Sequence, residues 1–341
     1  MLIATRDYLV QHLNKGTFLW KVLEFIQGML YVKNYLFYYK WNIFKQSSST
    51  REINIEFSSF CNLRCSFCSL DHLKPKVKIT PEVLDKFLND LTSDIRFRKV
   101  EVIHLHSGGE TLLHNKVGEL LQIIKKYKDL NKAKGLKFPI VNLLTNGTPL
   151  TETKTIEIIN SGAVDVMRFS MDGGSAKRFE EVRVRAKWDL FQKNMSFFLS
   201  ENKKSKFPVK THIISVIDPE NKLETSWMET EFVSILNSVD TYELRHPHTW
   251  AGEVDIDGDS SNNRNKPHKI GCGLLMHQLV LLPNGDINVC CTDLNSKGVV
   301  GNIKNDSLFD IYNSPTRRKW LELMYKGKKD QIDLCKNCET F

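Results

Sequence analysis

Three cysteines stand close enough in the sequence to share one metal cluster. Cys61, Cys65 and Cys68 are separated by gaps of three and two residues. Thiolates this close on one short loop can each bind a different iron of a cubane iron–sulfur cluster, which leaves the fourth iron without a protein ligand. An iron with an open position can hold a substrate. The alternative is a zinc loop or a redox pair, although zinc sites more often show two cysteine pairs with matching two-residue gaps.

The other cysteines form a second group near the carboxyl end of the chain, with none between the two groups. They are Cys272, Cys290, Cys291, Cys335 and Cys338. Four thiolates can close one cubane completely, so the sequence predicts a second metal site. We assign Cys272, Cys290, Cys335 and Cys338 as its ligands and Cys291 as the spare, although either of the adjacent thiols fits the spacing. A structural zinc site from the same four is the alternative.

A turn signal between these cysteines predicts how two of them meet. Asn284 and Gly285 form a strong two-residue turn signal inside the hairpin-like segment 281–289. We expect a β-hairpin there that brings Cys272 and Cys290 together.

From residue 53 onward, short apolar runs alternate with longer helix-like segments, which is the pattern of repeated β–α units. The predicted strands are residues 53–58, 100–106, 140–145, 164–170, 209–217 and 241–244. The predicted helices are residues 81–91, 116–130, 151–161, 179–200 and 225–236. Alternation alone allows either a barrel or a flat doubly wound sheet.

Polar residues and glycines follow the predicted strands, where parallel α/β folds carry their working residues. They are Gly108, Gly109, Glu110, Asn146, Ser170 and Asp172. Glycines let the backbone approach a ligand closely, and Glu110 can accept a hydrogen bond from an ammonium group. Each of these motifs alone is an ordinary turn.

The cysteine spacing, with Phe67 just before the last cysteine, resembles the signature of the radical S-adenosylmethionine (radical SAM) enzymes. The resemblance implies a partial (β/α)6 TIM-like barrel and a [4Fe-4S] cluster on Cys61, Cys65 and Cys68. It also implies S-adenosylmethionine at the open iron, cleaved reductively to a 5′-deoxyadenosyl radical that abstracts hydrogen from substrate. Because four weak motifs follow predicted strands in the family's order, the zinc alternative for the first cysteines becomes weak.

The same resemblance implies which residues bind S-adenosylmethionine. They are Phe67, Gly108, Gly109, Glu110, Asn146, Ser170, Asp172 and Arg183. Arg183 sits where many relatives carry an arginine for the methionine carboxylate, and a guanidinium fork suits that role. A surface arginine on a helix is the equal alternative for Arg183.

The carboxyl-terminal cysteines resemble the auxiliary-cluster extensions called SPASM, or "twitch" in a shortened form. The fuller form needs more cysteines than this part of the chain holds. The order and gaps look closest to the shortened form in the aminocyclitol dehydrogenase of butirosin biosynthesis. This resemblance implies an auxiliary [4Fe-4S] cluster.

An auxiliary cluster that accepts an electron suits the oxidation of an alcohol to a ketone. We therefore expect an oxidoreductase acting on a sugar, cyclitol or similar metabolite. The polar segment after the last predicted strand offers catalytic candidates in Arg245, His246 and His248, unless it is only a connector. The second hypothesis is a maturase that crosslinks, epimerises or oxidises a peptide side chain. A non-enzymatic iron–sulfur or zinc protein is the third, and it predicts no cofactor cleavage.

Three segments are expected along the chain. Residues 1–50 would form an amphipathic helical extension, residues 51–250 the barrel core and residues 251–341 the auxiliary-cluster domain. The stretch 17–45 is rich in aromatic residues and lysine, but its longest uncharged run is far short of the ~20 residues of a membrane span. Both peripheral membrane contact and packing on the protein surface fit it. Residues 46–50 read as a linker.

Charge and cysteine content bound the partners and the compartment. The net charge of +8 is scattered along the chain without a dense basic block or a nucleic-acid motif. We therefore expect no nucleic-acid partner, but a small molecule or peptide as substrate and a reductant such as flavodoxin or ferredoxin. Eight cysteines without a recognisable secretory signal point to a reducing compartment, so we expect a cytoplasmic protein.

Overall fold

The computed structural model describes residues 48–255 and 271–338, together with the single residues 18, 22 and 29. Within these ranges, nine strands form one sheet in the order β11-β10-β9-β1-β3-β4-β5-β7-β8. The strands are β1 (Glu52–Ile55), β3 (Val102–Leu105), β4 (Ile140–Thr145), β5 (Val166–Ser170), β7 (Lys210–Val216), β8 (Thr241–Arg245), β9 (Gln278–Leu281), β10 (Asp286–Asn288) and β11 (Val299–Asn302).

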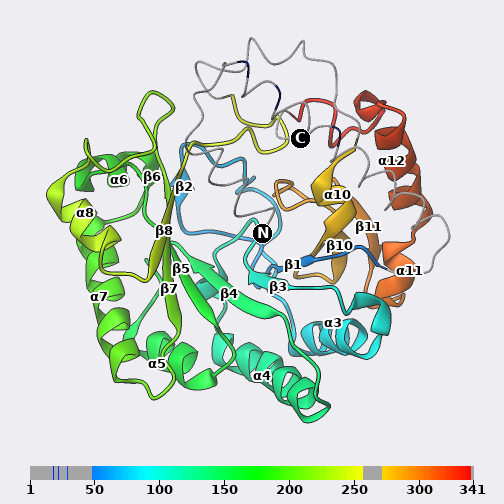
Figure 1. Cartoon of the computed structure of the whole chain (residues 1–341), viewed down its shortest axis with the longest axis horizontal. Helices are drawn as coiled ribbons and strands as arrows, with labels where there is room; N and C mark the ends of the chain where they lie inside the picture. The colour runs from blue at the N-terminus through cyan, green and yellow to red at the C-terminus, as the bar shows by residue number, and fades with distance from the viewer. Residues whose placement is uncertain (1–17, 19–21, 23–28, 30–47, 256–270, 339–341) are drawn as a thin grey trace.

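Six strands of this sheet pair in parallel, each with its neighbour, in the order β1, β3, β4, β5, β7 and β8. Helices lie along the outside of this curved part, as Figure 1 shows for α4, α5 and α7. They are α3 (Pro81–Ser93), α4 (Val117–Ala133), α5 (Glu152–Ser161), α6 (Ala176–Val182), α7 (Trp188–Lys204) and α8 (Thr230–Leu236). Short 3₁₀ turns η1 (Ile95–Phe97) and η2 (Thr111–Leu113) follow α3 and β3. The sheet is open rather than closed, so the predicted partial barrel is confirmed.

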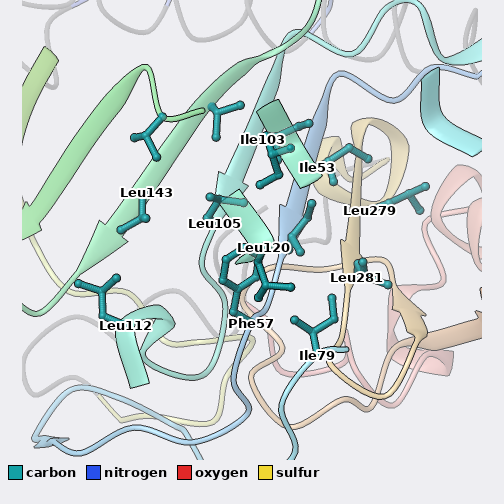
Figure 2. Packing of buried hydrophobic residues seen from close by; sticks show 14 of the residues in the cluster. Ile53, Phe57, Ile79, Ile103, Leu105, Leu112, Leu120, Leu143, Leu279 and Leu281 are labelled. Atoms are coloured by element: carbon teal, nitrogen blue, oxygen red, sulfur yellow. The ribbon is translucent and has the colours of Figure 1, made fainter. Parts of the chain in front are cut away.

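Along β3 and β5, buried apolar residues alternate with polar ones. Leu143 and Phe169 are fully buried, and the Phe169 ring packs edge-to-face on Phe198 of α7 with ring centroids 5.5 Å apart. Figure 2 shows this apolar layer continuing through β3, β1 and β9. Successive side chains of a strand point to opposite faces, so the residues between them, such as Asn142 and Arg168, lie on the inner face. Parallel strands are usually apolar on both faces, so the polar inner face marks the functional side.

Two helix starts follow the cap signals in the sequence. Thr80 accepts a hydrogen bond from the amide of Val83, with Pro81 in the first turn of α3, and Thr151 caps α5 in the same way. Side-chain oxygens at these positions satisfy amides that have no partner within the helix. Both predicted helices are confirmed to within two residues at their ends.

The single helix predicted for residues 179–200 is wrong. The chain instead forms α6, a short strand β6 (Arg183–Val184) and α7, with Arg185 at a positive φ of 79°. β6 pairs antiparallel with β2 (Arg64–Cys65) in the cysteine loop. This tertiary pairing overrides the local helical pattern. The predicted helix 225–236 also begins later, at Thr230.

The carboxyl-terminal part continues the same sheet. β9 pairs in parallel with β1, and the predicted hairpin forms between β9 and β10, with Gly285 at a φ of 95°. Around it lie α10 (Gly273–His277), α11 (Leu308–Tyr312), α12 (Pro315–Tyr325) and the turn η3 (Lys329–Gln331). Arg317 of α12 is fully buried and donates hydrogen bonds to the carbonyls of Tyr312 and Leu275, which ties these helices together.

The linker predicted for residues 46–50 is wrong where the structure describes it. Ser48, Ser49 and Thr50 are buried, and the Ser49 hydroxyl donates to the carbonyl of Met276 at 2.6 Å. The Ser49 amide also donates to the Tyr312 hydroxyl at 2.8 Å. These hydrogen bonds fix the segment to the carboxyl-terminal part.

The predicted helical extension 1–50 lies almost wholly outside the described residues. Across the part of the chain that the structure describes, no helix is both long enough and apolar enough to cross a lipid bilayer.

Candidate functional site

A cavity of about 150 Å³ opens at the carboxyl ends of the parallel strands, beside the cysteine loop. Its lining includes most of the predicted site residues, namely Cys61, Cys65, Phe67, Cys68, Gly109, Glu110, Asn146, Ser170, Asp172, Arg183, Arg245 and His248. Trp250 and His106 also line it. The loops that follow separate strands therefore meet at one place.

The three thiols of the first group are partly buried. Burial, followed by the carboxyl of Glu110, raises the pKa of Cys61 to about 12. Burial also raises the pKa of Cys65 to about 11, and the guanidinium of Arg183 partly offsets it. Metals bind the thiolate form, so cluster binding here must release protons. Three thiols that share a cavity suit an iron–sulfur cluster with one open iron.

Gly109, the second glycine of the loop after β3, lines the cavity and has no room for a side chain. A Cβ at Gly109 would lie 1.7 Å from the carbonyl oxygen of Ser58. The next amide, that of Glu110, donates to the carbonyl of Phe60 at 3.0 Å. This close backbone contact holds the strand-end loop against the cysteine loop.

Glu110 is held in place by three donors. Its carboxylate accepts from the Thr145 hydroxyl at 2.7 Å, from the Asn146 amide at 2.8 Å and from the Leu112 amide at 3.1 Å. Burial raises the pKa of Glu110, and these hydrogen bonds partly offset the effect. A carboxylate offers about four acceptor positions, so Glu110 keeps capacity for an ammonium group.

Arg183 and Asp172 form a buried ion pair at the cavity wall. Arg183 Nη2 lies 2.6 Å from Asp172 Oδ2, and the side chains are 7% and 1% exposed. Burial alone would lower the pKa of Arg183, but Asp172 and the thiol of Cys65 more than offset it, so the guanidinium stays charged. The alternative of a surface helix arginine is therefore wrong. Because β6 pairs with β2, Arg183 stands opposite Cys65.

Two predicted site residues do not line the cavity. The Gly108 amide instead donates to Glu56 Oε2 at 2.7 Å. His246 lies in an exposed segment, with its Nε2 at 2.9 Å from the carbonyl of Asn221. Glu56 is a buried carboxyl whose pKa is raised by burial, and it anchors the start of the glycine loop.

His248 and Trp250 lie side by side in the lining of the cavity. Their ring centroids are 4.1 Å apart. Burial, followed by the charge of Arg245, lowers the pKa of His248 to about 4, so its imidazole is neutral at pH 7. The sequence assigned no site role to His106. The sequence did hold a signal for it: His104 and His106 alternate with the apolar residues Ile103 and Leu105, which indicates that both histidines point to the inner face of the sheet.

A second, smaller cavity of about 20 Å³ lies in the carboxyl-terminal part. It is lined by the four assigned cysteines, Cys272, Cys290, Cys335 and Cys338, together with Ala251 and Lys329. Cys291 does not line it, and its amide donates to Gln278 at 2.9 Å. Burial raises the pKa of Cys335 to about 12, with the neighbouring thiols of Cys272 and Cys338 adding to the effect.

Neither cysteine group is drawn together around a single ion. Within the described ranges, no three His, Cys, Asp or Glu side chains gather as closely as the ligands of one metal ion.

One tight turn contributes residues to both cavities. Trp250 Nε1 donates to the carbonyl of Phe67 at 2.5 Å, and Trp250 lines the first cavity. The next residue, Ala251, lines the second cavity. A Cβ at Gly252 would lie 2.2 Å from the carbonyl oxygen of Asn337, between Cys335 and Cys338. The turn has φ values of 47°, 59° and 85° at these three residues.

The open parallel barrel and its paired cysteine cavities define an α/β protein built to hold iron–sulfur clusters. The family model described as "Radical SAM superfamily" matches residues 55–225, and the chain belongs to that superfamily. A second model, described as "Iron-sulfur cluster-binding domain" (SPASM), matches residues 272–339. The two matches imply a [4Fe-4S] cluster, an auxiliary cluster and S-adenosylmethionine.

A curated relative is similar over a limited segment. This is the tungsten-containing aldehyde ferredoxin oxidoreductase cofactor-modifying protein of Pyrococcus furiosus, with 30% identity over 118 residues. The match covers 35% of this chain and 30% of that relative's length.

Solved structures share the fold over most of the chain. BtrN, in complex with AdoMet and 2-DOIA, is 17% identical with a TM-score of 0.57, covering 86% of this chain and 95% of that one. SuiB of Streptococcus suis, bound to the precursor peptide SuiA, is 15% identical with a TM-score of 0.60, covering 96% and 77%. AdoMet-bound anSMEcpe is 15% identical with a TM-score of 0.52, covering 85% of each chain. At these identities the similarity establishes the fold alone.

Proposed function

We propose that this radical SAM enzyme oxidises a hydroxyl group of a sugar, cyclitol or similar small metabolite to a ketone. The observation that carries the proposal is the adjacency of the two cysteine cavities. Two consecutive residues, Trp250 and Ala251, line the first and the second cavity respectively. An electron acceptor in the second cavity would then lie next to the substrate in the first.

In this oxidation the alcohol loses a hydrogen atom, a proton and an electron and becomes a ketone. The carbinol carbon gives a hydrogen atom to the 5′-deoxyadenosyl radical, and the hydroxyl group gives a proton to a base or to water. The remaining electron is what an auxiliary cluster on Cys272, Cys290, Cys335 and Cys338 would accept. A reductant such as flavodoxin or ferredoxin supplies the electron that starts the cycle.

The chain's own side chains would orient the reactants. Glu110, fixed by three donors, would accept from the ammonium group of S-adenosylmethionine. Arg183, charged and buried, would face the carboxylate of the same molecule. His248, neutral at pH 7, accepts from the Trp250 amide through Nδ1 at 3.3 Å, so its Nε2–H can donate a hydrogen bond to a substrate oxygen.

Similarity supports this reaction. The carboxyl-terminal cysteine order resembles that of the butirosin aminocyclitol dehydrogenase. The match to BtrN, which was solved with AdoMet and 2-DOIA, covers 95% of the length of BtrN. Both point to a small, polar substrate.

The second candidate is a peptide maturase. SuiB, solved with its precursor peptide, matches 96% of this chain with a TM-score of 0.60. Peptide modification therefore stays as an alternative reaction for the same site.

Cluster content and cofactor cleavage test the first half of the proposal. Anaerobic reconstitution should give roughly eight irons per chain, as two cubanes require. Replacing Cys61, Cys65 and Cys68 together with alanine should abolish 5′-deoxyadenosine formation under dithionite. Cleavage that survives in this triple variant would sink the assignment.

Hydrogen transfer separates the two candidate reactions. Polyols deuterated at the carbinol carbon should pass deuterium to 5′-deoxyadenosine and yield a ketone, with peptides giving neither. The Cys335→Ala/Cys338→Ala variant should still transfer deuterium but form much less ketone. Deuterium transfer from peptides alone would replace the first proposal with the second.

A further inference from the structure

The inner face of the parallel sheet carries a continuous set of polar and charged side chains below the cavity. Those on β3, β4, β5, β7 and β8 are His104, His106, Asn142, Arg168, His212, Glu243 and Arg245. They alternate with apolar residues that pack against the outer helices. We call Arg168, His212, Arg245 and His106 the inner-face cluster.

Strand register places the cluster on one face of the sheet, with Arg168 beside His212 and Arg245 nearer the carboxyl ends of the strands. Arg168 of β5 pairs with His212 of β7, and Val216 of β7 pairs with Arg245 of β8. The charges of both Arg168 and Arg245 act on His106 and His212. Arg245 and His106 line the cavity, and Arg168 lies two residues before the cavity residue Ser170. Arg168 and His212 do not line the cavity but lie on the same face, nearer the middle of the sheet.

The cluster has more positive than negative charge. Arg168 is largely buried, and the nearest carboxylate, Glu243, lies 3.9 Å from its Nη2 and is 48% exposed. That distance is too long for a hydrogen bond, and the exposed carboxylate is partly screened by water. Arg245 acts on Asp172, which is already paired with Arg183 at 2.6 Å. Three guanidinium groups, those of Arg168, Arg183 and Arg245, thus face two carboxylates.

The histidines add hydrogen-bonding capacity without adding charge. Burial, followed by the charge of Arg168, lowers the pKa of His212, and burial lowers that of His106 strongly. Both rings are therefore neutral at pH 7. A neutral imidazole can donate one hydrogen bond.

Two nitrogen atoms of the cluster have no partner. Among the described residues, neither Arg245 Nε nor His212 Nε2 makes a hydrogen bond, although both atoms are buried. Leaving a buried donor unpaired costs free energy, so a polar ligand would relieve it. Both atoms belong to the face that carries the excess positive charge.

We propose that the inner-face cluster binds an anionic oxygen group of the substrate, either a carboxylate or a phosphate. Two guanidinium groups and neutral imidazoles suit the oxygens of such a group. The inference rests on the proposed function for the location of the substrate, and it adds the charge class of that substrate. The reacting hydroxyl would lie above, near the cysteine loop, while the anionic end reaches down to Arg168.

Anion binding to the reconstituted enzyme tests this directly. With S-adenosylmethionine present and chloride holding the ionic strength constant, inorganic phosphate or acetate should bind saturably in calorimetry. Arg168→Gln and Arg245→Gln should each raise the Kd at least tenfold, whereas Arg168→Lys should keep part of the affinity. Arg98→Gln, at an exposed arginine in the turn after η1, is the matched control and should bind as the unchanged enzyme does. Equal affinity in Arg168→Gln and the unchanged enzyme overturns the proposal.

The Kd values of phosphate and acetate show whether the site suits a phosphate or a carboxylate group, because a site shaped for one of them should bind it more tightly. A second measurement needs no substitution: bound anion should raise the titration midpoint of the His212 ring in NMR. No shift at saturating phosphate and acetate contradicts the inference. Anion binding without alcohol oxidation would overturn the proposed reaction alone, so the two failures are distinguishable.

Discussion

Arg183 gains its importance from its position between Asp172 and Cys65. In sequence it lies inside the predicted helix 179–200, where a surface arginine and an arginine for the cofactor carboxylate are equal alternatives. In the structure it begins β6, is buried, and holds its charge because Asp172 and the thiol of Cys65 surround it. A single residue thus joins the cysteine loop to the end of β5 that lines the cavity.

Removing this arginine should cost more stability than removing an exposed one. Arg183→Ala leaves Asp172 buried without its counterion, so we expect the free energy of unfolding to fall by about 3–5 kcal/mol. Arg178→Ala is the matched control, because its 2.7 Å pair with Asp218 is 42% exposed on the arginine side and should be worth under about 1 kcal/mol. Denaturant unfolding of the three proteins measures both losses. Similar losses in the two variants would contradict the expectation.

His104 should make stability depend on pH. Burial, followed by the charge of Arg168, lowers its pKa to about 4 in the folded chain, whereas an unfolded histidine titrates near 6.5. As the pH falls through this window, the unfolded state takes up the proton first, so the free energy of unfolding falls by up to about 3 kcal/mol.

His104→Asn removes this contribution. The loss of stability between pH 6.5 and pH 4 should therefore be smaller in the variant than in the unchanged chain, as followed by thermal unfolding at each pH. Parallel pH profiles for the two proteins would rule out a shifted His104.

At the scale of elements, the turn from Trp250 to Gly252 lies against both cysteine cavities. The Trp250 indole holds the first cysteine loop, and Gly252 packs on the backbone between Cys335 and Cys338. A change in this turn should therefore affect metal binding at the second cavity.

Gly252→Ala should lower the iron content of the second cavity. Its Cβ would meet the Asn337 carbonyl at 2.2 Å, so we expect iron to drop from roughly eight to roughly four per chain. Gly327→Ala is the matched control, because it shares the positive φ but has no atom within 4 Å of its Cβ. Iron analysis after reconstitution measures this, and full iron content in Gly252→Ala would refute it.

The elements that the sequence predicted well are those set by local patterns. The β4 strand matches its predicted range, and the other parallel strands differ by a few residues, because alternation and flanking turns are written in adjacent residues. The break at β6 was missed because its partner, Arg64–Cys65, is distant in sequence. The burial of Ser48 to Thr50 was missed for the same reason, since polar residues become buried only when Tyr312 and Met276 supply hydrogen bonds.

At the scale of the molecule, the pairing of β9 with β1 joins the two parts in one sheet. The sequence division at residue 250 separates two cysteine groups, yet β1 lies between β3 and β9. Arg317 and Tyr312 add hydrogen bonds from the carboxyl-terminal helices to buried backbone. The barrel part and the auxiliary-cluster part therefore share a core.

We expect the residues on both sides of position 250 to unfold in one transition. Loss of β9 would expose the edge of β1 and the apolar layer in Figure 2, so neither part gains by unfolding first. Coincident thermal transitions by far-ultraviolet circular dichroism, tryptophan fluorescence and calorimetry would support this. Two separated transitions would indicate independent domains.

The central place of β1 also has a consequence for synthesis on the ribosome. β1 is made early, but one of its edges has no partner until β9 has left the exit tunnel. Exposed strand edges pair readily with other chains. The nascent barrel therefore exposes the unpaired edge of β1 until β9 has been translated. Chaperones that shield this edge, or early delivery of iron–sulfur clusters, should raise the yield of soluble protein during expression.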